Sequence, residues 1–245
     1  MAWITGGGTG IGRTLALRLA ADGWTVAISG RRPGPLSEAA GLDAERLHGY
    51  PLDVADLQAV RTTVSRIESE LGPLQLVVLN AGIGQFIKLA EFNAEVCARH
   101  MQVNYLGAVN GIDAVLPLFL QRKGGHIVIV GSVAGYRGVP RAAAYGPTKA
   151  ALINLAESLR FELERKGIAI SICNPGFIDT AMTADNQFPM PFLMDLETAG
   201  EIIYRGIRRR KFEITCPWQL VRLLKLLRCL PYAWYFPLLR WFYAR

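Results

Sequence analysis

A chain of 245 residues with 51% hydrophobic content can bury a sizeable core and fits one α/β domain. Its 25 glycines and 13 prolines are spread along the sequence without a low-complexity run, so we expect no flexible linker. Much of the formal net charge of +7 lies after Arg205. Nucleic-acid binding is disfavoured, because aliphatic residues dilute the basic ones and no nucleic-acid motif is present.

The cysteine pattern and the N-terminus bear on the compartment. The four cysteines are Cys97, Cys173, Cys216 and Cys229. They are widely separated and match no metal-ligand spacing, so we expect reduced thiols and no metal site. The N-terminal stretch has neither a basic leader nor a signal-peptide pattern, which favours a cytoplasmic protein. No segment of about 18 uncharged apolar residues occurs, so we expect no membrane-spanning helix.

The first elements predict a phosphate-binding turn. An apolar run over residues 2–5, a glycine-rich turn and a helical pattern over residues 13–20 indicate a strand, a turn and a helix. Gly6, Gly10 and Gly12 let backbone N–H groups approach a pyrophosphate, because a Cβ would block that approach. Its position at the start of an α/β pattern makes this turn a candidate dinucleotide site.

The second strand, expected over residues 24–29, is followed by Gly30 and Arg31. An acidic residue at this strand end would bind the adenosine ribose hydroxyls, whereas an arginine accommodates a 2′-phosphate. We therefore predict a preference for NADP(H) through Arg31, with NAD(H) as the alternative cofactor. A solvent-exposed turn formed by Arg31 and Arg32 is the competing interpretation.

A third strand is expected to end within residues 50–54, after a loop that contains Pro33 and Pro35. Asp53 can accept a hydrogen bond from an adenine amino group. It can equally cap or precede the helix that we expect over residues 55–71.

The remaining pattern alternates strands and helices. We expect a strand over 74–79, a long helix over 92–121, a strand over 126–130, a helix over 145–166, a strand over 168–173, a helix over 197–210 and an edge strand over 212–216. This order predicts a doubly wound parallel sheet, a Rossmann fold, with ligands bound at the carboxyl ends of the strands. We assign the catalytic domain to residues 1–216 and a C-terminal amphipathic helical extension to residues 217–245.

Tyr145 and Lys149 lie four residues apart in an expected helix, so their side chains share one face. A positive charge beside a phenol favours the phenolate and lowers its pKa, which suits a general acid or base. A core-facing tyrosine beside a solvated lysine is the simpler interpretation of this pair alone. Pro147 is tolerable here if the helix starts one turn earlier.

Taken in order, these residues resemble the short-chain dehydrogenase/reductase family over roughly residues 1–216. The matching positions are Thr5, Gly6, Gly10 and Gly12 in the first turn, Asn80, Ala81 and Gly82 after the fourth strand, then Asn104, Ser132, Tyr145, Lys149, Pro175, Gly176 and Thr180. The implied cofactor-binding set also includes Ile11, Arg31, Asp53, Val54 and Ile178.

The resemblance implies an oxidoreductase that interconverts a ketone or aldehyde and an alcohol. Tyr145 would protonate the carbonyl oxygen as hydride leaves the nicotinamide, and Ser132 would polarise that carbonyl group. Lys149 would bind the nicotinamide ribose and lower the pKa of Tyr145, while Asn104 would support a water-linked proton path to Lys149. A homodimer or homotetramer, formed through the helices over 92–121 and 145–166, is expected by analogy.

Two segments bear on substrate and partners. Residues 180–195 include Met182, Phe188 and Phe192, and such adaptable apolar groups fit a steroid-like, retinoid-like or long-chain acyl substrate. Packing of this loop on the domain is the alternative. Residues 217–245 interleave basic, aliphatic and aromatic residues, as does a helix at a membrane surface. Docking on a partner subunit or over the substrate pocket is the other interpretation of this extension.

These features leave a second hypothesis of a different class. The chain could be a non-catalytic dinucleotide-binding sensor or scaffold at a membrane surface, peripheral to its inner face. The presence of Ser132, Tyr145 and Lys149 together favours the enzyme.

Overall fold

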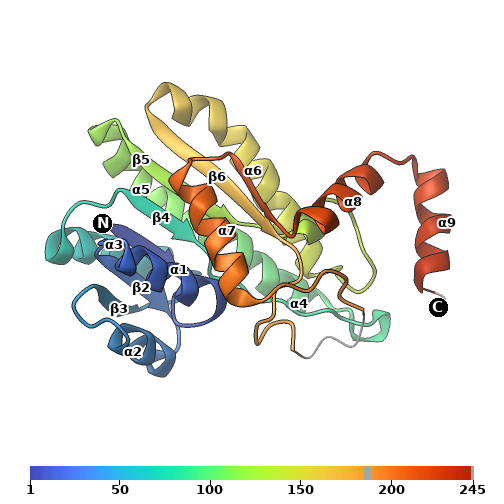
Figure 1. Cartoon of the computed structure of the whole chain (residues 1–245), viewed down its shortest axis with the longest axis horizontal. Coiled ribbons are helices and arrows are strands. Elements are labelled where there is room, and N and C mark those ends of the chain that lie inside the picture. The colour runs from blue at the N-terminus through green and yellow to red at the C-terminus, as the bar shows by residue number, and fades with distance from the viewer. Residues whose placement is uncertain (185–188, 244–245) are drawn as a thin grey trace.

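The computed structural model describes residues 1–184 and 189–243, and within them seven strands form one parallel sheet. The strands are β1 (Ala2–Thr5), β2 (Val26–Gly30), β3 (Leu47–Pro51), β4 (Leu76–Leu79), β5 (Gly125–Val130), β6 (Ile168–Pro175) and β7 (Glu213–Cys216). Their order is β3-β2-β1-β4-β5-β6-β7 (Figure 1), which confirms the predicted doubly wound fold. The winding direction reverses between β1 and β4, where ligands bind in such sheets.

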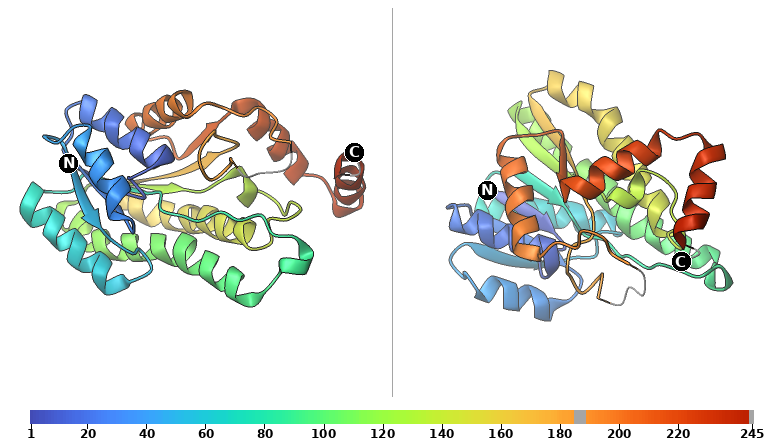
Figure 2. Two further views of the ribbon diagram at one scale, coloured as in Figure 1. Left: turned by 90° about the horizontal axis from the view of Figure 1, so that it is seen from below. Right: turned by 45° about the vertical axis from the view of Figure 1, so that its right-hand side comes forward.

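Helices cover both faces of the sheet, so the domain has three layers (Figure 2). One face carries α1 (Gly10–Ala21), α2 (Pro33–Gly41) and α7 (Leu196–Arg208); the other carries α3 (Leu57–Leu71), α5 (Gly107–Arg122) and α6 (Tyr145–Arg165). Alternate residues of a strand point to opposite faces. In β1, Trp3 therefore joins the core beneath α3, α5 and α6, whereas Ala2 and Ile4 join the core beneath α1 and α7.

The long helix expected over residues 92–121 is present as Ala94–Arg122, but a wider turn lies within it. The helix α4 (Ala94–His100) leads into a π-helical turn, Met101–Leu106, before α5 begins. Such π-helical turns are rare and frequently mark functional sites. Here the turn carries Asn104, whose side chain bonds to groups outside the helix rather than facing solvent.

The same stretch, Ala94–Arg122, is long and apolar enough to cross a membrane by length and composition alone. It is the one helical stretch of the described residues that meets this criterion. Its Val115 and Phe119 are fully buried against the sheet, as expected of a core helix. Its apolar character is therefore explained by packing within the domain.

Two further boundaries differ from the expectations. The segment with Pro33 and Pro35 is the helix α2 rather than a loop, because Pro33 occupies the first helical position, where no N–H group is needed. The strand β3 ends at Pro51, and α3 begins at Leu57 rather than at residue 55. Asp56 caps α3 by accepting a hydrogen bond from the Ala59 N–H group at 2.9 Å.

The helix α6 begins at Tyr145 itself, so an earlier start is not needed to accommodate Pro147. Pro147 is the third residue of the helix, and the N–H groups of the first turn have no partner within a helix. A hydrogen bond from the Gly146 N–H group to the Ala142 carbonyl oxygen, 2.7 Å long, forms a turn just before the helix.

The C-terminal segment folds as two helices, α8 (Trp218–Arg228) and α9 (Tyr232–Tyr243). Leu220 and Val221 of α8 are buried in the core, so this helix is packed on the domain. In both Figure 1 and Figure 2, α9 projects from the body beyond α8.

Candidate active site

The carboxyl ends of β1 and β4 are joined by side-chain hydrogen bonds at the point where the winding direction reverses. The Thr5 hydroxyl accepts from the Asn80 and Ala81 N–H groups, both at 3.0 Å. The Asn80 amide donates to the carbonyl oxygens of Thr5 at 3.0 Å and Gly6 at 3.2 Å. The Asn80 side chain is thus used to hold two strand ends at a fixed separation.

The turn after β1 is packed too tightly for side chains at two of its glycines. Gly6 has φ +68°, and a Cβ there would lie 2.8 Å from the Asn80 amide nitrogen. A Cβ on Gly12 would lie 2.3 Å from the Gly6 carbonyl oxygen. The turn leads into α1, whose first N–H groups have no partners within the helix and form a favourable site for an anion.

A cavity of about 320 Å³ lies between this turn, the end of β2 and the segment after β4. This volume lies in the usual range of small-molecule sites. Of the predicted cofactor residues, the cavity is lined by Gly6, Arg31, Asp53, Val54, Ala81 and Gly82. The closely packed glycines, the N-terminus of α1 and the cationic side chains of Arg31 and Arg32 fit a dinucleotide phosphate chain.

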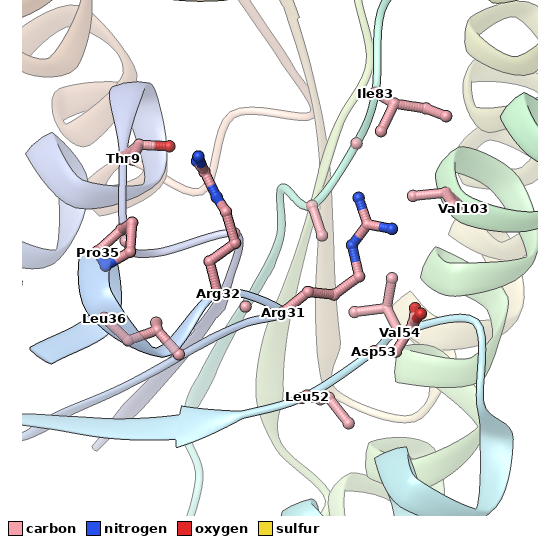
Figure 3. Close-up of a pocket in the computed structure, with 15 residues that line it drawn as sticks. Thr9, Arg31, Arg32, Pro35, Leu36, Leu52, Asp53, Val54, Ile83 and Val103 are labelled. Atoms are coloured by element: carbon pink, nitrogen blue, oxygen red, sulfur yellow. The ribbon is translucent and has the colours of Figure 1, made fainter.

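Both Arg31 and Arg32 extend into this cavity (Figure 3), Arg32 on the side of Thr9 and Arg31 on the side of Val103. Arg32 and Thr9 were not predicted as site residues, although Arg32 directly follows Arg31. Asp53 does not cap α3, because one of its carboxylate oxygens accepts from the Ala55 N–H group at 3.0 Å in a local turn.

Ser132 lies where β5, β6 and α6 meet. Its hydroxyl oxygen accepts from the Ala134 N–H group at 3.1 Å, and the hydroxyl group lies 3.5 Å from the Pro175 carbonyl oxygen. Its side chain also lies near the phenol of Tyr145, the first residue of α6, and acts to lower the pKa of that phenol. The fold therefore brings together Ser132 and Tyr145, as predicted from the strand ends.

The half-buried Tyr145 has apolar neighbours. The Phe86 ring centroid lies 6.1 Å from its own, and Met182 lies close to Gly84 beside the Tyr145 ring. Burial raises the pKa of Tyr145 to about 12, and the nearby Ser132 side chain acts in the opposite direction. Loss of hydration dominates in the ligand-free protein, and the lowering of this pKa by Lys149 stays a prediction.

Lys149 is only 5% exposed, although it carries an ammonium group. Burial lowers its pKa to about 8. Its Nζ atom donates to the Val130 carbonyl oxygen at 2.9 Å and lies 5.5 Å from the Tyr145 ring centroid. A buried lysine held at a strand end is unusual, and buried charged groups of this kind are common at functional sites.

Asn104 links the segment after β4 to α6. Its side-chain oxygen accepts from the Ile83 N–H group at 2.8 Å, and its amide donates to the Ile83 carbonyl oxygen at 2.9 Å. The same amide donates to the Thr148 hydroxyl at 3.1 Å, and that hydroxyl donates to the Tyr145 carbonyl oxygen at 2.7 Å. The side chain thus positions α6, and the water-linked path to Lys149 stays a prediction.

The segment after β6 lies on the other side of the glycine-rich turn from Asn80. The Gly176 N–H group donates to the Cys216 carbonyl oxygen at 2.7 Å, and Ile178 is buried in the core. Thr180 lies beside the glycine-rich turn, since a Cβ on Gly10 would be 3.7 Å from its methyl carbon. Of the predicted lid, Phe188 lies outside the described residues.

The loop between Ser132 and Tyr145 is clamped to the C-terminal helices by Arg137, which was not predicted. The Arg137 guanidinium donates to the carbonyl oxygens of Leu227 at 2.6 Å and Leu230 at 2.7 Å. It also lies over the Tyr235 ring, 3.7 Å from its centroid, and the Tyr235 hydroxyl donates to the Gly138 carbonyl oxygen at 2.7 Å. No local pattern identifies this role, because the partners lie at least 90 residues away.

A second anchor holds the start of the same loop. The Tyr136 hydroxyl donates to the Glu213 carboxylate at 2.7 Å, and burial together with that carboxylate raises the pKa of Tyr136. Glu213 also pairs with Lys225 of α8. The C-terminal helices therefore contact the segment that separates the two candidate catalytic residues.

Known proteins share the family and the fold of this chain. The sequence model of a family described as short chain dehydrogenase matches residues 1–189. An uncharacterized oxidoreductase of Myxococcus xanthus is 39% identical over 236 residues, covering 94% of this chain and 92% of the relative. A short-chain dehydrogenase from Streptomyces avermitilis has the same fold, with a TM-score of 0.82 at 24% identity over 91% of each chain. A structure of ElxO with NADP bound has a TM-score of 0.79 at 26% identity, covering 87% of this chain and 95% of that one.

Gly12→Ala should abolish dinucleotide binding, because its Cβ would overlap the Gly6 carbonyl oxygen and force the turn apart. Gly41→Ala is the matched control, since nothing lies within 4 Å of its Cβ position. Titration of each variant with NADPH, followed by nicotinamide fluorescence, compares the two. Unchanged affinity in Gly12→Ala would show that the turn does not form the phosphate site.

Proposed function

The chain belongs to the short-chain dehydrogenase/reductase family, and we propose that it reduces the carbonyl group of an apolar substrate with NADPH. Membership makes it an oxidoreductase of the short-chain type that uses NAD(P) and acts on small molecules. One observation carries the proposal: Tyr145 begins α6 with its phenol near Ser132, about one helical turn from the buried Lys149.

We assign the proton transfer to Tyr145. Its raised pKa keeps the phenol protonated at neutral pH, so it can donate to a carbonyl oxygen as negative charge develops there. The Ser132 hydroxyl donates a second hydrogen bond to the same oxygen and polarises the double bond. A bound nicotinamide ring supplies the hydride, and the alcohol product forms when the proton from Tyr145 reaches its oxygen.

Lys149 and Asn104 hold the reacting groups in place. An ammonium group has three N–H donors, and the Val130 carbonyl oxygen occupies one of them. We assign the others to the hydroxyls of the nicotinamide ribose, as the family resemblance implies. Asn104 fixes the distance between the segment after β4 and α6, and so the position of Tyr145 beside the cofactor.

The proposed preference for NADP(H) rests on two arginines that line the cavity. Arg31 and Arg32 both extend into it (Figure 3), and guanidinium groups bind phosphate through paired hydrogen bonds. The solved relative ElxO carries NADP, which supports this choice. We infer that Arg31 contacts the 2′-phosphate, because it is the residue that directly follows β2.

The surroundings of Tyr145 support an apolar substrate of the steroid-like, retinoid-like or long-chain acyl kind. Phe86 and Met182 lie beside its ring, and Phe192 and Leu193 are exposed on the segment that follows β6. Aromatic and thioether groups adapt to bulky apolar ligands.

We also propose a cytoplasmic homodimer or homotetramer that pairs through α5 and α6. Two large apolar side chains are exposed on these helices, Leu120 on α5 and Phe161 on α6. Burial of such groups between subunits would remove apolar surface from water.

Tyr145→Phe should lower turnover by roughly 10²–10⁴-fold, the usual contribution of a general acid, while NADPH binding is retained. Tyr204→Phe is the matched control, because its hydroxyl contacts Arg208 on the surface of α7. NADPH oxidation with a panel of apolar ketones measures turnover, and fluorescence titration measures binding. Binding without turnover in the unaltered chain would favour a dinucleotide-binding sensor instead.

The two directions of the reaction should differ in pH dependence. Oxidation of an alcohol needs the Tyr145 phenolate, whose fraction rises roughly tenfold per pH unit below a pKa of about 12. Reduction needs the protonated phenol and should stay flat up to the Lys149 pKa of about 8, above which the loss of the ammonium charge weakens both directions. Stopped-flow kinetics at saturating cofactor, from neutral pH upwards, measures both directions. A flat profile for oxidation would contradict proton transfer by Tyr145.

Arg31→Asp should shift the ratio of kcat/KM for NADPH over NADH toward NADH by roughly ten- to a hundredfold, the range for a charge-assisted hydrogen bond. Steady-state kinetics with both cofactors gives the ratio. Arg32→Asp is the comparison, because this side chain enters the same cavity from the next position. A shift confined to Arg32→Asp would assign the 2′-phosphate to Arg32 rather than to Arg31.

A further inference from the structure

The helix α9 has two apolar faces that differ in their surroundings. Tyr235 is buried, and its hydroxyl and ring contact Gly138 and Arg137 of the domain. Trp234, Leu238 and Trp241 recur at the i, i+4 and i+7 spacing, which places them on one stripe of the helix. Their exposed fractions are 69%, 42% and 55%, so the stripe lies at the surface.

The orientation of the stripe is fixed by contacts that a neighbouring face of α9 makes with the domain. Arg137 lies between the carbonyl groups at the end of α8 and the rings of Tyr232 and Tyr235, with its guanidinium 5.0 Å and 3.7 Å from their centroids. These contacts fix the rotation of α9, which projects from the body of the domain (Figure 2). An exposed aromatic stripe on a projecting helix typically marks an interaction surface.

Charge indicates the kind of partner. Residues 217–245 contain Arg222, Lys225, Arg228, Arg240 and Arg245 but no aspartate or glutamate. The segment therefore contributes five positive charges to a chain whose net charge is +7. Lys225 pairs with Glu213 of β7, whereas Arg240 is exposed on α9 itself, one residue from Trp241.

We propose that the stripe formed by Trp234, Leu238 and Trp241 binds the surface of an anionic lipid bilayer. Tryptophan rings are enriched at the level of lipid headgroups, and arginines beside them attract anionic lipids. A second copy of this chain is the weaker occupant, because its own C-terminal segment would bring positive charge against positive charge. The docking requires no turnover and is independent of the proposed reaction.

The position of α9 gives this docking a consequence for the site. The helix is attached to the loop that separates Ser132 from Tyr145, through Arg137 and Gly138. Docking would bring that loop close to the bilayer, where apolar compounds concentrate. This consequence, unlike the docking itself, rests on the proposed function, because it concerns delivery of an apolar substrate.

Co-sedimentation of the full chain with vesicles tests the proposal. One set of vesicles contains phosphatidylcholine alone, and the other contains equal amounts of phosphatidylcholine and phosphatidylglycerol. We expect the chain to sediment with the anionic vesicles, and to be released at high salt as the charges are screened. Recovery of the full chain in the supernatant of both sets would overturn the proposal, and so would equal binding to both.

Variants of the stripe and of Arg240 separate the apolar contribution to vesicle binding from the electrostatic one. Trp234→Ser combined with Leu238→Ser should lower the partition coefficient on the order of tenfold or more, and Arg240→Gln should lower it roughly fivefold. Leu42→Ser, at a position 61% exposed beyond α2, is the matched control and should bind as the unaltered chain does. Thermal unfolding and NADPH titration verify that each variant is folded, and Arg240→Gln alone tests the proposal if the double variant does not fold.

Self-association of the chain through the stripe must be distinguished from lipid binding. Light scattering of the unaltered chain and of the Trp234→Ser, Leu238→Ser variant, without lipid, gives their masses. A smaller mass for the variant, together with unchanged vesicle binding, would assign the stripe to contact between copies and overturn the proposal. Unchanged mass with reduced vesicle binding would support it.

Discussion

The close approach of β1 to β4 is the constraint on which the rest of the site depends. The Thr5 hydroxyl and the Asn80 amide join the two strand ends, and the space that remains admits no Cβ at Gly6 or Gly12. Backbone N–H groups can therefore reach a phosphate at the start of α1. The same bonds fix the point at which the chain leaves β4. Asn104 then links the segment after β4 to α6 through its bonds to Ile83 and Thr148.

Burial acts on the two titratable groups of the site in opposite directions. It raises the pKa of the Tyr145 phenol and lowers the pKa of the Lys149 ammonium, and in both cases the neutral form is favoured. In the ligand-free site, the Tyr145 phenol is therefore a proton donor, and the neighbouring Lys149 loses its proton more readily than a free lysine does. A charged group placed beside them would change both values, because buried charges are only weakly screened by solvent.

Local motifs were predictable, whereas long-range contacts were not. Gly6, Gly12, Ser132, Tyr145 and Lys149 follow strand ends or share a helix face, so spacing alone places them near each other. The π-helical turn was missed, because it depends on bonds from Asn104 to groups distant in the sequence. The role of Arg137 was missed for the same reason, and the effect of burial on the pKa of Tyr145 was missed because a sequence pattern does not report burial.

The clamp at Arg137 orders events during synthesis of the chain. Its carbonyl partner Leu227 follows it by 90 residues, so this anchor forms only after the whole sheet has left the ribosome. The glycine-rich turn, by contrast, needs only strands made in the first third of the chain. The segments that form the nucleotide cradle are thus synthesised early, whereas the partners that anchor the loop between Ser132 and Tyr145 are among the last residues to be made.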